Sequence, residues 1–130
     1  MRGHEVIQFE THLKQLFDQI DEELELRWGT SYALHPARSR HRTTANPEDD
    51  GLFNIGASFS AGFGSEAGRG YVIEVRMSTL DVVPEPVRNT IRAFVAARVR
   101  ELLPEYFKDA HLDVVQDGGT FKIVGDLRLY

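Results

Sequence analysis

The chain has no cysteine among its 130 residues. A disulfide, a thiolate nucleophile, a zinc–cysteine site and an iron–sulfur cluster are therefore excluded. The sequence also has no run approaching the ~20 apolar residues that a transmembrane helix needs. Its first residues lead into an acidic segment and lack the apolar core of a signal peptide. We therefore expect a cytoplasmic protein without a membrane segment.

Positive charge is in the minority, with 15 Lys and Arg against 20 Asp and Glu, a net charge of −5. This balance argues against a dedicated nucleic-acid binder, because such proteins need a basic surface for the phosphates. The charge is also uneven. Residues 1–28 carry seven acidic and three basic side chains, residues 29–47 carry three arginines and no acid, and residues 48–50 are all acidic. The arginines are thus flanked by two acidic segments that can neutralise them.

Hydrophobic residues make up 42% of the chain, which is ordinary for a globular protein, and 130 residues correspond to one domain, 1–130. Residues 5–28 are predicted to form an amphipathic helix, because apolar side chains recur there at steps of three and four. The members of this stripe are Val6, Phe9, Leu13, Leu16, Phe17, Ile20 and Leu24. Gly29 suits the end of the helix, since it accepts the left-handed conformation.

Two segments alternate with a period of two. Within residues 52–63, the odd positions from 53 carry apolar side chains and the even positions from 54 carry small residues (Asn, Gly or Ser), and residues 71–77 alternate again. A glycine-rich stretch separates them, so the segment 52–77 is predicted to be an antiparallel hairpin.

A second helix is predicted over 84–103, with Pro84 in its first turn and Pro104 as its stop. A second hairpin is predicted over 111–130, turning at Asp117-Gly118-Gly119. The order helix, hairpin, helix, hairpin predicts an α+β fold (α-β-β-α-β-β). Its simplest form has two layers, a four-stranded, mostly antiparallel sheet with both helices on one face.

The segment 29–51 has no sustained period and contains Pro36 and Pro47. About 20 residues without structure are unusual inside a domain. Two interpretations stay open for this irregular loop: Tyr32-Ala33-Leu34 is a short strand, or the segment is a functional or partly disordered loop.

No catalytic motif is present. The glycines of residues 62–70 match the spacing of a dinucleotide fingerprint, but that motif must lead into a helix and here leads into a strand. A P-loop lysine and a Gly-x-Ser-x-Gly elbow are also missing, and no two histidines have the spacing of a helical metal pair. We therefore expect no enzyme, no cofactor and no metal site, although an enzyme with an unrecognised site stays open.

Two surfaces are candidates for function. On the first predicted strand one face carries only small residues, which permits close approach of another molecule. A protein acting by contacts, as a homodimer or with a protein partner, would use this outer face of the sheet, with the interface residues Asn54, Ser58 and Ser60.

The alternative is a binding module for a small anionic ligand, because arginine forks and glycine amides both bind anions. Its candidate residues are Arg38, Arg40, Arg42, Gly64, Arg69 and Arg76. Nucleic acid is not an expected partner, since no aromatic side chain interleaves these arginines.

Overall fold

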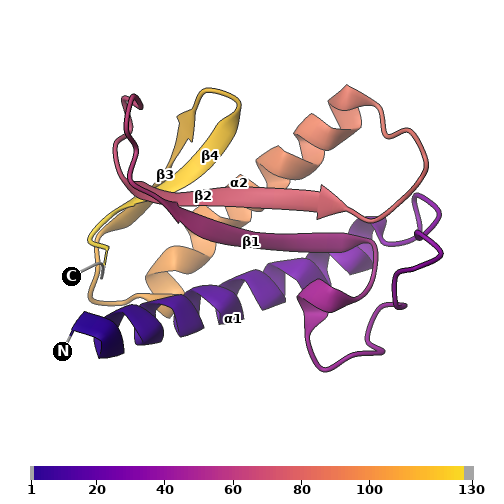
Figure 1. The fold of residues 1–130 in the computed structure, drawn as a ribbon, viewed down its shortest axis with the longest axis horizontal. Coiled ribbons are helices and arrows are strands. Elements are labelled where there is room, and N and C mark those ends of the chain that lie inside the picture. Colours follow the sequence, from indigo (N-terminus) through magenta and orange to yellow (C-terminus); the bar gives the residue numbers. More distant parts are fainter. Residues whose placement is uncertain (1, 128–130) are drawn as a thin grey trace.

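The computed structural model describes residues 2–127, and their side chains from residue 7 onward. Two helices cover one face of a four-stranded antiparallel sheet (Figure 1). The elements are α1 (Arg2–Trp28), η1 (Pro47–Asp49, a 3-10 turn), β1 (Phe53–Ser60), β2 (Gly70–Met77), α2 (Glu85–Tyr106), β3 (Leu112–Asp117) and β4 (Thr120–Gly125). The predicted α+β fold and its order of elements are confirmed.

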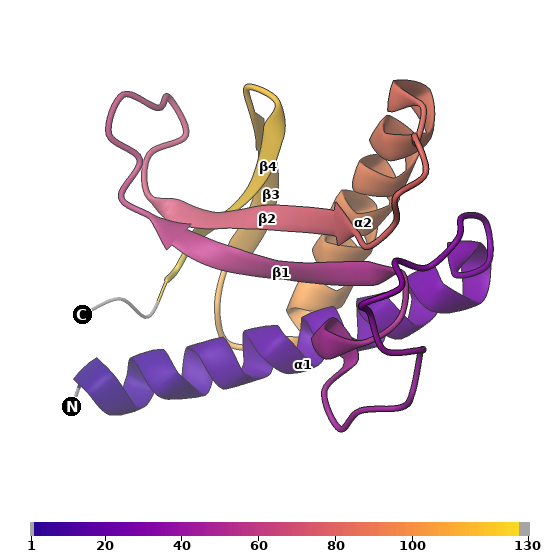
Figure 2. The same cartoon turned by 45° about the vertical axis from the view of Figure 1, so that its right-hand side comes forward.

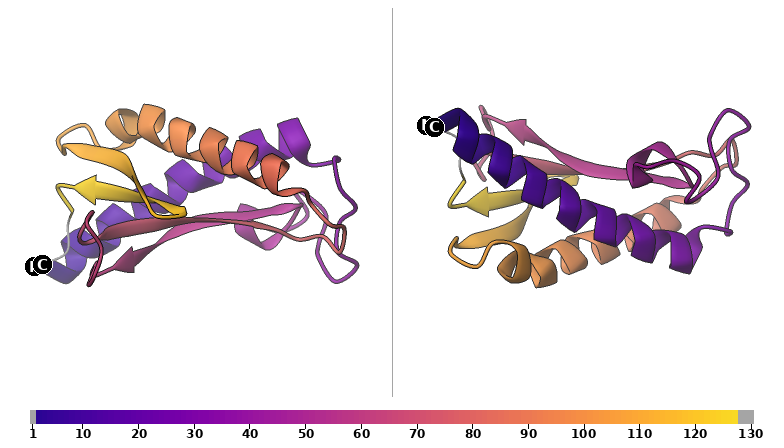
Figure 3. Two further views of the ribbon diagram at one scale, coloured as in Figure 1. Left: turned by 90° about the horizontal axis from the view of Figure 1, so that it is seen from above. Right: turned by 90° about the horizontal axis from the view of Figure 1, so that it is seen from below.

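The strand order is β1-β2-β4-β3, and all neighbours are antiparallel. The β1–β2 hairpin pairs from Phe53 with Met77 to Ser60 with Gly70, whereas β2 meets β4 over three residue pairs only. The sheet twists, so that β3 and β4 turn away from the direction of β1 (Figures 2 and 3). β1 and β3 are the two edge strands.

The core lies between the helices and the inner face of the sheet. From α1 it receives the predicted stripe, and from α2 a matching row of aliphatic residues. Its buried helical members include Phe9, Leu13, Leu16, Phe17, Ile20, Leu24, Ile91, Val95, Val99 and Leu102. The strands contribute Phe53, Ile55, Tyr71 and Ile123, all almost fully buried.

The second helix runs past its predicted stop. Pro104 lies inside α2, which continues to Tyr106. A proline at this position lacks only one amide donor in the final turn. The residues around it are held by the core: Leu103 and Phe107 are buried, and the Tyr106 hydroxyl donates to Gln19 at 2.6 Å. Burial therefore outweighs the local signal of the proline.

The first strand is shorter than predicted. It ends at Ser60, and Phe63, expected on the apolar face, is 96% exposed. The chain leaves the sheet at Gly62, whose φ of 76° is open to glycine and strained for other residues. A side chain there would also meet the Gly68 carbonyl at 2.1 Å. The second hairpin matches the prediction through Gly125, and residues 128–130 lie outside the described residues.

The glycine-rich loop (residues 62–70) covers a buried lysine. Lys122 is 2% exposed, and its ammonium group contacts the Asp117 carboxylate at 2.8 Å, the Gly68 carbonyl at 2.8 Å and the Ser65 hydroxyl at 3.2 Å. Its aliphatic stem passes Gly70, where a Cβ atom would lie 2.7 Å from Cγ of Lys122. The loop thus supplies two of the hydrogen-bond acceptors that replace the water lost by the buried ammonium group.

Replacing Lys122 with methionine is expected to loosen the glycine-rich loop, because methionine keeps the stem and removes all three contacts. Losing about 1.4 kcal/mol of local stability corresponds to roughly tenfold more frequent opening. Limited trypsin digestion at the exposed Arg69 measures this opening, with Lys108→Met as an exposed control. Equal cleavage rates in both variants would show that Lys122 does not hold the loop.

In the part of the chain that the structure describes, neither helix has the length and apolar character that a membrane crossing requires.

Candidate functional site

The irregular loop 29–51 is ordered by contacts with the rest of the protein. Residues 32–34 form no strand; instead the His35 amide donates to the Ser78 carbonyl at 2.8 Å, and the Ala33 amide donates to Asp81 at 2.9 Å. A single parallel bridge pairs Ser39 with Asp50. Of the two interpretations left open by the sequence, the short strand is wrong.

Arg38 holds the end of this loop against β1. Its Nε atom donates to the Gly51 carbonyl at 3.0 Å, and Nη2 lies within 3.2 Å of the carbonyls of Glu48, Asp50 and Phe53. A guanidinium group suits this role because it carries several donors in one rigid plane. The side chain is half-buried and engaged with the protein's own backbone.

Glu25 meets the same turn from the helix side. Its carboxylate is 8% exposed and accepts from the amides of Leu52 at 3.1 Å and Phe53 at 2.8 Å. Gly51 has φ 73°, and a Cβ atom there would lie 2.6 Å from the Glu25 carboxyl group. Glycine is therefore required at this position both by the backbone conformation and by the close approach of the carboxylate.

Asp21 lies one turn before Glu25 on α1 and is 1% exposed. Neither of its carboxylate oxygens has a hydrogen-bond partner among the described residues. Burial, followed by the negative charges of Glu25, Asp50 and Asp18, raises the pKa of Asp21 to about 8 against the lowering effect of Arg38. Unpartnered buried carboxyl groups are rare in proteins, because they have lost their water without a replacement.

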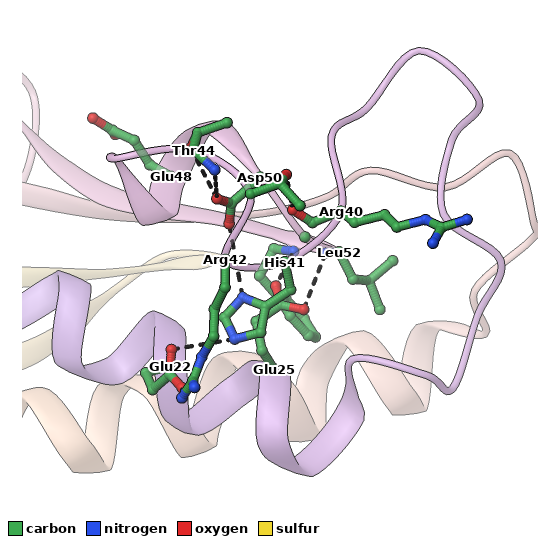
Figure 4. Close-up of polar contacts among 12 residues, drawn as sticks. Glu22, Glu25, Arg40, His41, Arg42, Thr44, Glu48, Asp50 and Leu52 are labelled. Atoms are coloured by element: carbon green, nitrogen blue, oxygen red, sulfur yellow. Dashed lines mark hydrogen bonds and ion pairs between the residues drawn. The ribbon is translucent and has the colours of Figure 1, made fainter.

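His41 reaches the same place from the loop. Its Nε2 atom lies 3.2 Å from the Glu22 carboxylate and its Nδ1 atom 3.7 Å from Asp50, without a well-formed hydrogen bond to either (Figure 4). The next residue, Arg42, has φ 67° in the left-handed region and pairs with Glu22. This turn directs the His41 ring toward α1.

Asp50 completes the site from the β1 side. It is 1% exposed, and its Oδ2 atom accepts from the Thr44 amide at 3.0 Å and hydroxyl at 2.8 Å. Within the part of the chain that the structure describes, its Oδ1 atom has no hydrogen-bond partner. We refer to Asp21, Glu25, His41 and Asp50 as the carboxylate–histidine cluster. One potential ligand atom from each of Asp21, Glu25 and His41 lies within 4.8 Å of the others.

The predicted anion-binding residues do not meet. Arg40 points away from the cluster into solvent (Figure 4), Arg42 pairs with Glu22, and Arg76 pairs with Glu74 at 3.2 Å. Arg69 and Gly64 lie in the glycine-rich loop, which is at the opposite end of the β1–β2 hairpin from loop 29–51 (Figures 1 and 2). Of the loop arginines, Arg42 is thus neutralised by the acidic first helix, and Arg38 is held by backbone carbonyls.

The predicted interface residues are placed on β1, on the face away from the helices. Ser58 is exposed and donates to Glu74 at 3.2 Å, and Asn54 and Ser60 are half-buried. Between β1 and α1 lies a groove of about 410 Å³. Its apolar wall comes from Leu13, Phe17, Ile55, Ala57, Phe59 and Tyr71, and charged residues at its rim are Glu10, Lys14, Asp18 and Glu48.

The sequence analysis missed the cluster, although a signal was present. Counting in steps of four along α1, the row Phe9, Leu13 and Phe17 continues to Asp21 and Glu25. Residues four apart lie on one helix face, so two acids were placed in line with a buried apolar row. His41 and Asp50 carried no comparable signal, because an irregular loop brings them in.

Comparison with known proteins finds relatives of unassigned function. Residues 4–125 match a protein family described as "Uncharacterised protein". An uncharacterized protein of Borreliella burgdorferi strain B31 is 36% identical over 118 residues, which covers 91% of this chain and 92% of the relative. No solved structure matches the chain.

Proposed function

The chain belongs to this family of uncharacterised proteins, and we propose a function from its geometry because the family's description carries no activity. The protein acts by contact: it pairs with a second copy of itself along the free edge of β1. The observation that carries the proposal is a row of unpaired backbone groups on that edge. The contact surface predicted from the sequence is the outer face of β1, whereas the surface proposed here is the free edge of the same strand.

The direction of the free groups follows from Phe53. Its amide donates to Glu25 and its carbonyl accepts from Arg38, so both groups face away from β2. Strand residues alternate in direction, so the backbone groups of Ile55, Ala57 and Phe59 face the same way. Among residues 2–127 no hydrogen bond to these outward groups is formed. Glu25 and Arg38 thus bind the outward backbone groups of Phe53, as a neighbouring strand would. They leave the outward groups of the next three positions open.

The composition of β1 supports pairing. Edge strands usually carry proline or charged residues that discourage contact with other strands. β1 reads Phe-Asn-Ile-Gly-Ala-Ser-Phe-Ser, without either. An uncharged edge with free donors and acceptors is a template for another strand.

A second copy fits this edge by symmetry. In an antiparallel pair centred on Ala57, Ile55 of one copy faces Phe59 of the other, so all three open positions are used in both chains. The second copy's Phe59 then lies on the inner side beside Ile55, at the groove lined by Leu13 and Phe17. Phe59 is 48% exposed in the single chain and would become covered.

The anion-binding alternative has weaker support. Arg38 and Arg42 are engaged with the protein's own carbonyl and carboxylate groups, and Arg69 lies at the far end of the hairpin. An anion at either place would meet one free arginine rather than a cluster.

Sedimentation velocity over a range of concentrations tests the pairing. We expect a monomer–dimer equilibrium with a dissociation constant in the micromolar range, roughly 1–100 μM, because a single strand edge buries less than a standard interface. Ala57→Pro removes the central outward amide and is expected to give a monomer, since proline is tolerated where an edge amide faces outward.

Ala57→Val is the matched control, because it keeps the amide and suits a strand, and it should still dimerise. Circular dichroism confirms that both variants are folded. A wild-type protein that stays monomeric at millimolar concentration, or an Ala57→Pro variant that dimerises as well as Ala57→Val, would contradict the proposal.

A further inference from the structure

We propose that the carboxylate–histidine cluster binds one divalent first-row transition metal ion, with Asp21, Glu25 and His41 as its protein ligands. This inference does not rest on the pairing of β1 edges, because it concerns side chains on α1 and in loop 29–51. It revises the expectation from the sequence that the protein has no metal site.

The first argument is the state of Asp21. This carboxyl group is almost completely buried, and no described residue donates a hydrogen bond to either of its oxygens. It lies beside two further buried carboxyl groups, Glu25 and Asp50. Three buried acids in one place cannot all be ionised without repelling one another, and they have little water to solvate them. A bound cation offsets that repulsion and supplies Asp21 with the partner that it lacks.

The second argument is the freedom of His41. Among the described residues neither ring nitrogen makes a well-formed hydrogen bond, and the ring is only 26% exposed. When one nitrogen of a ligand histidine binds a metal ion, the other is usually held by a carboxylate. Glu22 and Asp50 lie 3.2 and 3.7 Å from the two nitrogens, so either choice of metal-binding nitrogen leaves a carboxylate for the other.

The third argument is distance. The candidate ligand atoms of Asp21, Glu25 and His41 lie within 4.8 Å of one another. In a tetrahedral site, ligand atoms at about 2.1 Å from the ion are about 3.4 Å apart. The ligand atoms must therefore approach one another by up to about 1.4 Å, and His41 lies on a loop rather than on a strand or helix.

The donor set selects the class of metal. One imidazole with two carboxylates suits zinc, manganese, iron or cobalt, whereas magnesium and calcium prefer ligands that are all oxygen. Three protein ligands also leave a coordination position for water or another small molecule, as in catalytic metal sites.

Binding of Zn²⁺ and Co²⁺ to the untagged full chain tests the proposal. After treatment with EDTA and dialysis, isothermal titration with Zn²⁺ is expected to give one ion per chain, and Co²⁺ is expected to give a visible absorption band. The melting temperature should rise with either ion, because a ligand that binds only the folded state stabilises it.

Two ligand variants and two matched controls locate the site. Asp21→Asn and His41→Gln are each expected to weaken Zn²⁺ binding by more than about 100-fold, because the loss of a supporting residue outside the ligand set already costs about 10–100-fold. Asp49→Asn and His111→Gln change the same residue types at exposed positions and should bind as the wild type does. Circular dichroism verifies that each variant is folded.

Stoichiometric binding that is lost in both ligand variants and kept in both controls supports the site. The absence of binding at millimolar Zn²⁺ and Co²⁺, or binding that survives Asp21→Asn and His41→Gln, overturns it. In the first case Asp21 is a buried protonated acid, and in the second the ion binds elsewhere on the surface. Neither result bears on the dimer, whose test uses Ala57 variants.

Discussion

Replacing Arg38 with alanine is expected to lower the free energy of unfolding by about 3 kcal/mol, although the residue belongs to an irregular loop. Its guanidinium group satisfies four backbone carbonyls, and a buried polar group left without a partner costs roughly 1–3 kcal/mol. The four costs do not add in full, because water will reach some of these carbonyls after the change. Urea unfolding followed by circular dichroism measures the difference.

Two further variants define the cause of the loss. Arg38→Lys keeps the charge but not the planar fork, so we expect it to recover less than half of the lost stability. Arg40→Ala removes an exposed arginine from the same loop and should change the free energy of unfolding by less than about 0.5 kcal/mol. If Arg38→Ala is as mild as Arg40→Ala, the contacts of Arg38 do not hold the loop.

Replacing Asp21 with asparagine is expected to stabilise the metal-free protein at pH 8 and to leave its stability at pH 4 nearly unchanged. The folded-state pKa of Asp21 is about 8, against 3.8 for an ordinary aspartate. Between these values the folded protein keeps the proton that the unfolded chain has released. The contribution of Asp21 to stability is therefore complete below about pH 4 and is lost as the pH rises through about 8.

The expected slope is at most about 1.4 kcal/mol per pH unit, since one unit of pKa corresponds to that free energy. Asparagine imitates the protonated acid, because it has nearly the same shape and carries no charge. Over the roughly four pH units between the two pKa values this slope gives an upper limit of about 6 kcal/mol, so we expect Asp21→Asn to exceed the wild type by several kcal/mol at pH 8 in the presence of EDTA.

Asp49→Asn is the control for the pH series, because it removes an exposed carboxylate from the neighbouring turn. Urea titrations at several pH values between 4 and 8 compare the three proteins. Parallel curves for the wild type and Asp21→Asn across this range would mean that Asp21 titrates as an ordinary exposed acid. The test also complements the metal titration, because it reports on the cluster without an ion.

The secondary structure was predictable where one face of an element is buried along its whole length. The apolar stripe on α1 and the alternating apolar residues of β1 and β2 line two sides of the same core. Sequence periods of 3.6 and 2 residues therefore predicted both the helix and the strands. The ends of elements were less predictable. Phe63 continues the alternation into solvent, and Pro104 marks a stop inside α2, because distant contacts decide where each element ends.

The candidate sites were predicted less well than the fold. The arginines and glycines stand out in the sequence, but most of them serve the fold: Arg38 binds carbonyls, Arg42 pairs with Glu22, and the glycine-rich loop covers Lys122. Neutralisation of the loop arginines by the flanking acidic segments was among the expectations, and among the described residues the contacts match it for Arg42 and not for Arg38 or Arg40. Asp21 and His41 stand out only when their surroundings are known.

The sequence by itself determined the class of fold, the order of its elements and the faces that they bury, because these depend on periodic patterns that local geometry translates directly into structure. It also excluded all chemistry that needs cysteine. Only the tertiary structure decided which strand edge is free and which polar groups are buried without partners. Those properties depend on distances between residues that are far apart in the chain, such as Asp21 and His41, and no local pattern encodes them.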